Sequence, residues 1–228
     1  MNETFDVTVV DVVQWLHDEG LIRLAGLAGR QSNPVAAYAV DIATGTVTAY
    51  QVSASGTSSH ALTVVADELP DPEGTAERLV VVGVTVAESV LVVDLSIANV
   101  MAINGDRPEF AARAWALQLL LNPEVTITTN SAQLAIADEP RFRHTFIPGG
   151  GTTVTVDDTR PPVATIAFNP VDDRPDRLDL AADGTGEMYV GTRFWALRRA
   201  LRVDDDTWTA LAADMATPPD AEYAVEGD

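Results

Sequence analysis

The stretch 79–103 is the most apolar part of the 228-residue chain, and it limits the possible folds more than any other feature. Glu88 and Asp94 interrupt the stretch, and each carboxylate would cost about 2.5–3.5 kcal/mol at the centre of a membrane helix. Residues 79–86 and 90–93 are rich in β-branched side chains and flank a short turn-like segment. We therefore expect consecutive buried strands that begin with a hairpin, and not a transmembrane span.

A strand–helix–strand unit is predicted next, over residues 100–129. Residues 100–103 are apolar, whereas Pro108 opens a run of helix formers with apolar side chains at positions 110, 114, 117 and 121. Asn122-Pro123 ends this helix, and residues 125–129 alternate in the manner of a strand. A unit of this length suits a crossover between parallel strands of one sheet.

The N-terminal region has the pattern of a small α+β unit. Thr8 and Asp11 have the spacing of a capping box, which predicts a short helix that ends at Gly20. Residues 35–52 form a predicted hairpin, and residues 61–66 form a further short strand.

The segment 70–74, rich in Pro and acidic residues, marks a predicted domain boundary. The predicted fold class is α/β, with a Rossmann-like or degenerate P-loop C-terminal part and a small α+β N-terminal part. The predicted domains are the α+β part at 1–72, the α/β domain at 73–217 and a disordered acidic tail at 218–228. The other elements predicted in the α/β domain are a short helix at 131–136, strands at 153–156 and 163–168, a hairpin at 178–190 and a helix that begins at 204.

Composition excludes several kinds of chemistry. All 14 basic residues are Arg and there is no Cys, against 34 Asp and Glu and a net charge of −20. A P-loop lysine, a Schiff base, a thiol nucleophile and a disulfide are therefore excluded. No metal or cofactor is expected, and neither His60 nor His144 lies in a motif that would organise a hydrolase.

The charge also bears on partners and location. A net charge of −20 repels nucleic-acid backbones and anionic membrane surfaces, so another protein is the expected partner. Residues 1–11 carry three acidic and no basic side chains, unlike a secretory signal. We expect a cytoplasmic protein without membrane contact.

The junction between the predicted strand and helix near position 105 lies where a P-loop would lie. It contains a single glycine and no lysine, and Pro108 removes an N–H, which favours a structural turn over ATP hydrolysis. As an alternative, the carboxyl ends of parallel strands would form a ligand-binding crevice here. The residues expected to line this crevice are Asn104, Gly105, Asp106, Arg107, Thr129, Asn130 and Ser131.

A family resemblance covers residues 78–215. The segments that carry it are Leu91–Leu95, Val100–Asp106, the Ala- and Leu-rich helix after them, and Ala182–Thr185. This part of the chain resembles the α/β module of large actinobacterial proteins that combine it with LysM or bacterial transcriptional-activator domains. That module is similar to a degenerate P-loop domain, so the resemblance implies an ATPase-like fold without its catalysis, within a secretion or regulatory assembly.

Four of the 14 arginines lie within residues 193–202, interleaved with two aromatic residues. Such interleaving is typical of surfaces that bind a partner, and on a helix Arg198 and Arg202 would share a face. Three acidic residues follow at 204–206, so local ion pairing is the alternative that we favour. The arginine cluster considered for partner binding consists of Arg193, Trp195, Arg198 and Arg202.

These observations lead to three ranked hypotheses for function. The first is a non-enzymatic protein-binding or scaffold module, in an actinobacterial secretion or regulatory assembly. The second is a regulatory domain that senses a small ligand in the predicted crevice. The third is a hydrolase that uses carboxylates and a histidine, although no catalytic residue can be named.

Overall fold

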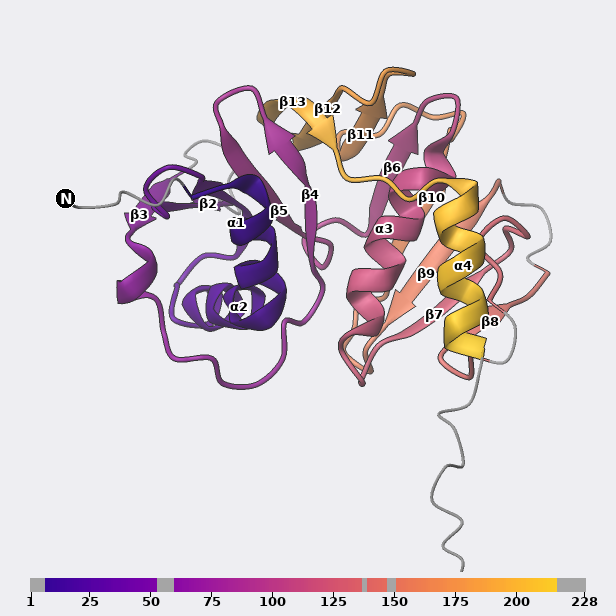
Figure 1. The fold of residues 1–228 in the computed structure, drawn as a ribbon, viewed down its shortest axis with the longest axis horizontal. Helices are drawn as coiled ribbons and strands as arrows, with labels where there is room; N and C mark the ends of the chain where they lie inside the picture. Colours follow the sequence, from indigo (N-terminus) through magenta and orange to yellow (C-terminus); the bar gives the residue numbers. More distant parts are fainter. Residues whose placement is uncertain (1–6, 53–59, 137–138, 147–150, 217–228) are drawn as a thin grey trace, which may run out of the picture.

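The computed structural model describes residues 7–52, 60–136, 139–146 and 151–216 (Figure 1). The helical elements are α1 (Val9–Trp15), the π-helical segment η1 (Leu16–Gly20), α2 (Leu21–Gly29), the 3-10 turn η2 (Ala66–Glu68), α3 (Pro108–Leu120) and α4 (Asp205–Ala216). The strands are β1 (Val35–Asp41), β2 (Val47–Gln51), β3 (Ala61–Val64), β4 (Leu79–Thr85), β5 (Ser89–Asp94), β6 (Val100–Asn104), β7 (Thr126–Thr129), β8 (Phe142–His144), β9 (Thr153–Asp157), β10 (Ala164–Phe168), β11 (Arg177–Leu180), β12 (Gly186–Val190) and β13 (Arg193–Ala200).

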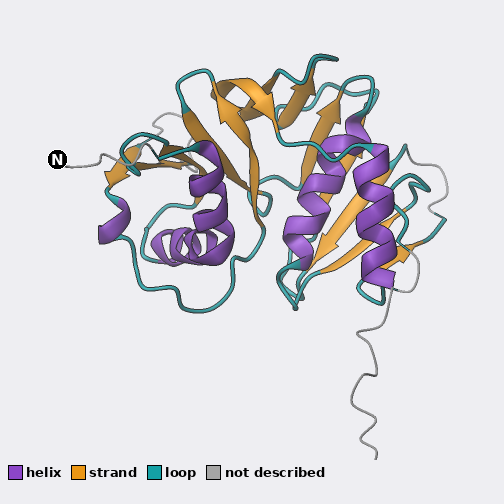
Figure 2. Cartoon of the chain, viewed as in Figure 1, coloured by secondary structure: helices purple, strands orange, loops and turns teal. Residues whose placement is uncertain are grey.

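One mixed sheet contains all 13 of these strands, in the order β3-β2-β1-β5-β4-β13-β12-β11-β6-β10-β9-β7-β8. Figure 1 and Figure 2 show the helices in two groups, with α1 and α2 to the left of the β4–β5 pair and α3 and α4 to its right. The predicted α/β class is confirmed at this level. None of the helices in the described ranges has the length and apolar character that a membrane crossing requires.

The first helix begins as predicted and ends differently. The Thr8 side chain accepts from the Asp11 N–H, and the Asp11 side chain accepts from the Thr8 N–H, which confirms the capping box. The prediction that the helix ends at Gly20 was wrong, because the chain continues through η1 into α2 without leaving helical geometry. A Cβ on Gly20 would lie 2.9 Å from the Trp15 ring, so the glycine makes room for that indole within the helix.

The buried strands predicted from the apolar stretch are confirmed as the antiparallel pair β4–β5. Both faces of the pair are buried. Val81 and Val92 pack in a cluster with Leu24 of α2, whereas Val80 belongs to the larger cluster that contains Trp115 of α3. The predicted hairpin β1–β2 is also confirmed, and β1 pairs with β5 across the segment 70–74, so strands from both sides of the predicted boundary share one sheet.

The strand–helix–strand unit is present, with its two strands further apart than a simple crossover would place them. β6 is parallel to its neighbours β10 and β11. β7 runs in the same direction as β6, but β10 and β9 lie between them. The predicted apolar stripe of α3 was only partly right, because Trp115 and Leu119 are fully buried whereas Leu121, just after the helix, is 67% exposed.

The C-terminal part departs from the sequence analysis at two places. Residues 193–200, where Arg198 and Arg202 would share a face only on a helix, form the strand β13, because pairing with β12 and β4 decides their conformation. Residues 131–136 form a turn closed by a bond from the Leu134 N–H to the Ser131 carbonyl, and not a helix. The helix after Asp204 is confirmed as α4, with the Asp204 carboxylate accepting from the Thr207 N–H.

Candidate functional site

A cavity of about 380 Å³ lies between α1, β4 and the segment that links β13 to α4. Figure 1 shows this linking segment, in yellow, crossing in front of the sheet from the end of β13 to the start of α4. The apolar residues that line the cavity are Val9, Val13, Val81, Val84, Val90, Phe110 and Leu201. Its charged lining residues are Arg199, Arg202 and Asp204. The volume and mostly apolar lining are typical of small-molecule sites, which measure roughly 300–1,000 Å³.

One strand irregularity turns two neighbouring arginines of β13 in different directions. The register of β13 against β4 shifts between Leu197 and Arg199, so Arg199 comes to lie opposite Val84, a residue of the cavity wall. Arg198, in the bulge, instead donates to Glu88 at 2.6 Å. Bulges commonly redirect one side chain of a strand in this way.

The backbones of β4 and β13 approach each other closely at this place. A Cβ on Gly83 would lie 2.2 Å from the Arg199 carbonyl oxygen, so only glycine permits the observed pairing. This glycine therefore fixes the position of Arg199 beside the cavity.

The two cavity arginines differ from most other arginines of the protein. Neither the Arg199 nor the Arg202 guanidinium makes a hydrogen bond or an ion pair with any residue in the described ranges. The pKa of Asp183 is lowered mainly by hydrogen bonds from Thr185, and to a smaller extent by the charge of Arg202. Asp204 is committed to capping α4, and the hydrogen bond from the Thr207 N–H lowers its pKa. The cavity thus offers two guanidiniums whose donors are unused.

The predicted crevice residues at the end of β6 are engaged with the protein itself. The Asn104 amide donates to Asp179 at 2.7 Å. The Gly105 N–H donates to the Asn169 side chain at 2.9 Å, and that side chain donates back to the Gly105 carbonyl at 3.0 Å. Arg107 pairs with Glu109 and, at 2.7 Å, with Asp205, whereas Asp106 is exposed. The junction is a cross-linked turn, as the structural interpretation of the sequence predicted.

The second group of predicted crevice residues follows β7 and is held by β9. Thr129 donates to the Thr153 carbonyl at 2.9 Å and accepts from the Ser131 N–H at 3.0 Å. The Asn130 side chain accepts from the Thr153 N–H at 2.8 Å and donates to the Gly151 carbonyl at 3.1 Å. Both groups lie at the carboxyl ends of strands that run in the same direction, but β10 and β9 separate them. The structure does not join them into one crevice, and ligand binding by these residues stays a prediction.

The arginine cluster does not form one surface either. Arg193 lies over the Tyr50 ring at 4.5 Å, and Trp195 meets the same ring edge-on at 5.3 Å. Arg198 is paired with Glu88, and Arg202 lines the cavity.

The acidic residues after the cluster have other partners than expected. Asp205 pairs with Arg107 at 2.7 Å and with Arg113 at 2.8 Å, so it does not neutralise the arginines of residues 193–202. The favoured prediction of ion pairing within this part of the chain was therefore wrong in its partners. The register shift in β13 separates Arg198, which pairs with Glu88, from Arg199, which lines the cavity, and no sequence signal indicates it.

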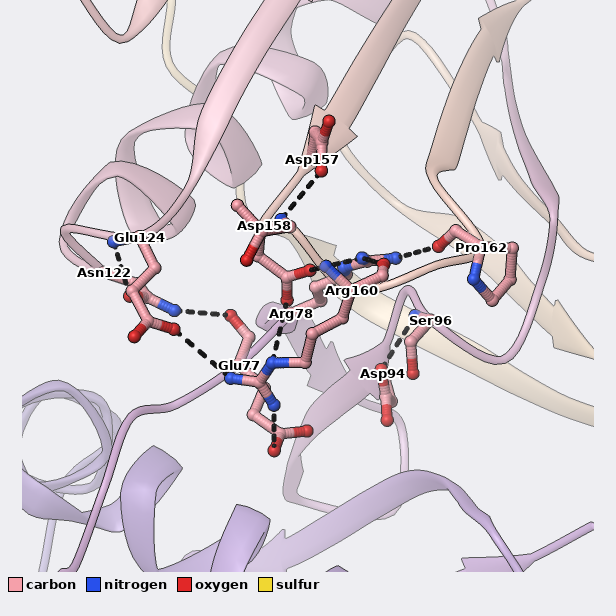
Figure 3. A network of polar contacts seen from close by, with 11 residues as sticks. Glu77, Arg78, Asp94, Ser96, Asn122, Glu124, Asp157, Asp158, Arg160 and Pro162 are labelled. Carbon is pink, nitrogen blue, oxygen red and sulfur yellow. Dashed lines mark hydrogen bonds and ion pairs between the residues drawn. The ribbon is translucent and has the colours of Figure 1, made fainter.

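Figure 3 shows a second polar region, in which a buried ion pair is joined to half-exposed residues. The side chains of Arg78 and Asp158 are 3% and 2% exposed and form an ion pair, and Arg78 also donates to the carbonyls of Arg160 and Pro162. Burial raises the pKa of Asp158, but hydrogen bonds from Arg78 and from the Arg160 N–H outweigh burial, so its pKa lies below the usual value. Arg160 extends the network to Glu77 at 2.7 Å. These contacts tie the segment before β4 to the segment after β9, which is a structural role.

Comparison with known proteins adds no further assignment to these sites. No protein-family model, no curated protein and no solved structure matches the chain. Within the described residues, no group of three or more His, Asp and Glu side chains is placed to hold a metal ion.

Proposed function

We propose that the protein is a non-enzymatic binding module, and that the cavity beside β4 takes a small ligand with a carboxylate group and an apolar body. The observation that carries this proposal is the presence of Arg199 and Arg202, both without an acceptor in the described residues, next to a wall of valines. A guanidinium presents a planar set of N–H donors that matches a carboxylate, and such charge-assisted bonds are stronger than neutral ones. The valine wall would bury the apolar part of the same ligand.

The overall charge makes this local arrangement significant. A net charge of −20 repels anions, so an anionic ligand needs local cations to bind at all. Most arginines in the described ranges are already in ion pairs, for example Arg78, Arg113 and Arg198. Arg199 and Arg202 are therefore two cations that a carboxylate can engage without breaking an existing pair, and both line the cavity.

A protein-binding role is the second candidate, and a row of three residues on the sheet favours it. Arg177, Tyr189 and Phe194 are direct cross-strand neighbours on β11, β12 and β13. Arg177 lies 3.9 Å from the centre of the Tyr189 ring, and Phe194 is 53% exposed. Aromatic residues and arginine are the residue types that dominate binding energy at protein interfaces. Membership of an actinobacterial secretion or regulatory assembly remains part of this second proposal.

The relation to degenerate P-loop or Rossmann-like domains also remains a proposal. It is supported by the parallel neighbours of β6 and by a glycine, Gly105, at the junction with α3. The mixed order of the sheet is shared by many α/β proteins and does not by itself favour one of them.

Titration calorimetry with a panel of short-chain, branched and aromatic monocarboxylates tests the ligand proposal. The matched amides of the same compounds serve as ligand controls, because they keep the apolar body and remove the charge. We expect Arg199→Ala and Arg202→Ala each to weaken carboxylate binding by roughly tenfold or more, the effect of one lost charge-assisted hydrogen bond. Arg143→Ala is the matched control, since Arg143 is exposed on β8, the strand at the end of the sheet, and does not line the cavity. Equal binding of acids and amides, or equal loss in the control variant, would overturn the proposal.

A further inference from the structure

The turn between β6 and α3 contains the single Asn–Gly pair of the sequence, Asn104–Gly105. In such a pair the backbone nitrogen of the glycine can attack the side-chain carbonyl carbon of the asparagine. A bond forms between these two atoms, ammonia leaves, and a succinimide ring results. Water then opens the ring at either of its carbonyl groups, which leaves an aspartate or an isoaspartate. Glycine favours this reaction because it has no Cβ that hinders the approach.

The nitrogen that would attack is occupied in the folded protein. The Gly105 N–H donates to the Asn169 side-chain oxygen at 2.9 Å, and the Asn169 side-chain nitrogen donates to the Gly105 carbonyl at 3.0 Å. Asn169 is itself fixed, because its own N–H donates to the Ile103 carbonyl at 3.0 Å. Its φ of 43° is a conformation in which asparagine is enriched. The bond to Asn169 must break before the Gly105 nitrogen can lose its proton and attack.

The side chain that would be attacked is held by a different strand. The Asn104 side-chain nitrogen donates to Asp179 Oδ1 at 2.7 Å, and the two residues are direct partners in the parallel pair β6–β11. The other oxygen of Asp179 accepts from Arg177 at 2.9 Å, so this carboxylate is fixed at both ends. The backbone is also confined here, since a Cβ on Gly105 would lie 2.7 Å from the Leu180 carbonyl oxygen of β11.

The two reacting groups are therefore drawn toward opposite neighbours of β6. In the sheet β6 lies between β11 and β10. Asp179 of β11 holds the Asn104 amide, whereas Asn169, the residue after β10, holds the Gly105 N–H. Ring closure needs the nitrogen and the carbonyl carbon in contact and aligned. Both sets of bonds must open before this geometry can form.

We propose that Asn104 is a deamidation site that the folded structure protects. Asn169 and Asp179 are the positioning residues, because they keep the nucleophile and the carbonyl carbon apart. Deamidation then proceeds only from molecules in which the end of β6 has opened. The proposal rests on the hydrogen bonds at this turn and does not depend on the cavity ligand.

The product would not fit the place of the asparagine. A carboxylate at position 104 would face Asp179 where an N–H now donates at 2.7 Å. The hydrogen bond would be lost, and two like charges would lie side by side, which is unfavourable. An isoaspartate would in addition lengthen the backbone by one carbon atom where β6 pairs with β11. Each opening of the turn thus carries a chance of damage that weakens the junction for good.

Peptide mapping by mass spectrometry tests the protection, after incubation of the full chain in weakly alkaline buffer with and without guanidinium chloride. We expect Asn104 to convert roughly tenfold faster or more in the unfolded chain, because the bonds at both groups are then absent. In native buffer Asn169→Ala should accelerate the conversion by roughly threefold to tenfold, the effect of a lost hydrogen bond. Equal rates in the folded and unfolded chain, or in the native protein and Asn169→Ala, would overturn the proposal.

Two controls separate this local effect from a general loss of stability. Thr8→Ala removes the cap of α1 and keeps the bonds of Asn104 and Gly105, so conversion of Asn104 should stay at the native rate. In every sample Asn130, which precedes a serine, is the internal standard and should convert equally in the native protein and in Asn169→Ala. An acceleration in Thr8→Ala equal to that in Asn169→Ala would contradict the assigned role of Asn169.

Amide hydrogen exchange of the unmodified protein provides a test that needs no variant. We expect the Gly105 N–H to exchange roughly tenfold slower or more than in the unfolded chain, because its bond to Asn169 must open first. Exchange at the rate of the unfolded chain would contradict the protection.

The consequence of the reaction has its own test. Asn104→Asp should lower the folding equilibrium constant by roughly tenfold or more, as for the loss of a hydrogen bond to a charged group. The double variant Asn104→Asp/Asp179→Asn exchanges the two side chains across the strands, so it should recover most of that loss. Native stability of Asn104→Asp, or no recovery in the double variant, would refute the expected clash with Asp179.

Discussion

Removing the negative charge of the buried Arg78–Asp158 pair is the perturbation with the largest expected effect on stability. In Asp158→Asn the side-chain shape is kept, and Arg78 retains the carbonyls of Arg160 and Pro162. The guanidinium is 3% exposed, so its charge would remain buried without its ion-pair partner. Breaking a buried pair in this way costs about 3–5 kcal/mol, which is a large part of the roughly 5–15 kcal/mol that stabilises a typical domain.

The measurement is urea unfolding followed by tryptophan fluorescence, with Glu88→Gln as the matched control. Glu88 and Arg198 are 59% and 50% exposed, and an exposed pair contributes only about 0.2–1 kcal/mol. A cost below about 1 kcal/mol for Asp158→Asn, equal to the control, would refute the assignment of a structural role to the pair.

The pH dependence of the same variant provides a second test. The pKa of Asp158 is lowered in the folded protein, so the stabilisation is present above the ordinary aspartate pKa and is lost as the pH falls through the lower, folded-state value. The difference in unfolding free energy between the native protein and Asp158→Asn should therefore shrink on acidification below about pH 4. A difference that stays constant from pH 7 to pH 3 would contradict the linkage.

Two further predictions concern local structure. Thr8→Ala removes the capping box of α1 and should lower the unfolding free energy by about 1 kcal/mol. Thr44→Ala, in an exposed turn, serves as the comparison. An unchanged urea midpoint for Thr8→Ala would show that the cap does not contribute to stability. Gly83→Ala places a Cβ 2.2 Å from the Arg199 carbonyl oxygen, so it should separate β4 from β13. The expected loss in the free energy of unfolding is about 3 kcal/mol or more. A variant with the thermal stability of the native protein would contradict the close approach of the two strands.

The elements that the sequence predicts well are those with a local signal. The β-branched runs of β4 and β5, the capping box at Thr8 and the proline at the start of α3 each act within a few residues, so their patterns are visible without the fold. Gly20 misled the prediction because its role is to accommodate Trp15, a contact that only the helix itself creates.

The candidate site depends on contacts that are remote in sequence. Val13, Val84, Phe110 and Arg202 meet because β13 returns to pair with β4, more than 100 residues away along the chain. The bulge that turns Arg199 toward the cavity depends on that pairing as well. Sequence patterns therefore indicated an unusual group of arginines. They did not indicate that these arginines lie on a strand or that each has a different partner.

The pairing of β4 with β13 also bears on how the protein is synthesised. Gln118 covers the edge of β4 at Val81, but the edge at residues 83–85 pairs only with β13. A ribosome that adds about 5–20 residues per second needs roughly 6–23 s between residue 85 and residue 200. During this time the N-terminal five strands present an open, valine-rich edge to other nascent chains. Chaperone dependence in the cell should accordingly be greatest for chains truncated before β13 and should end once residue 200 has emerged.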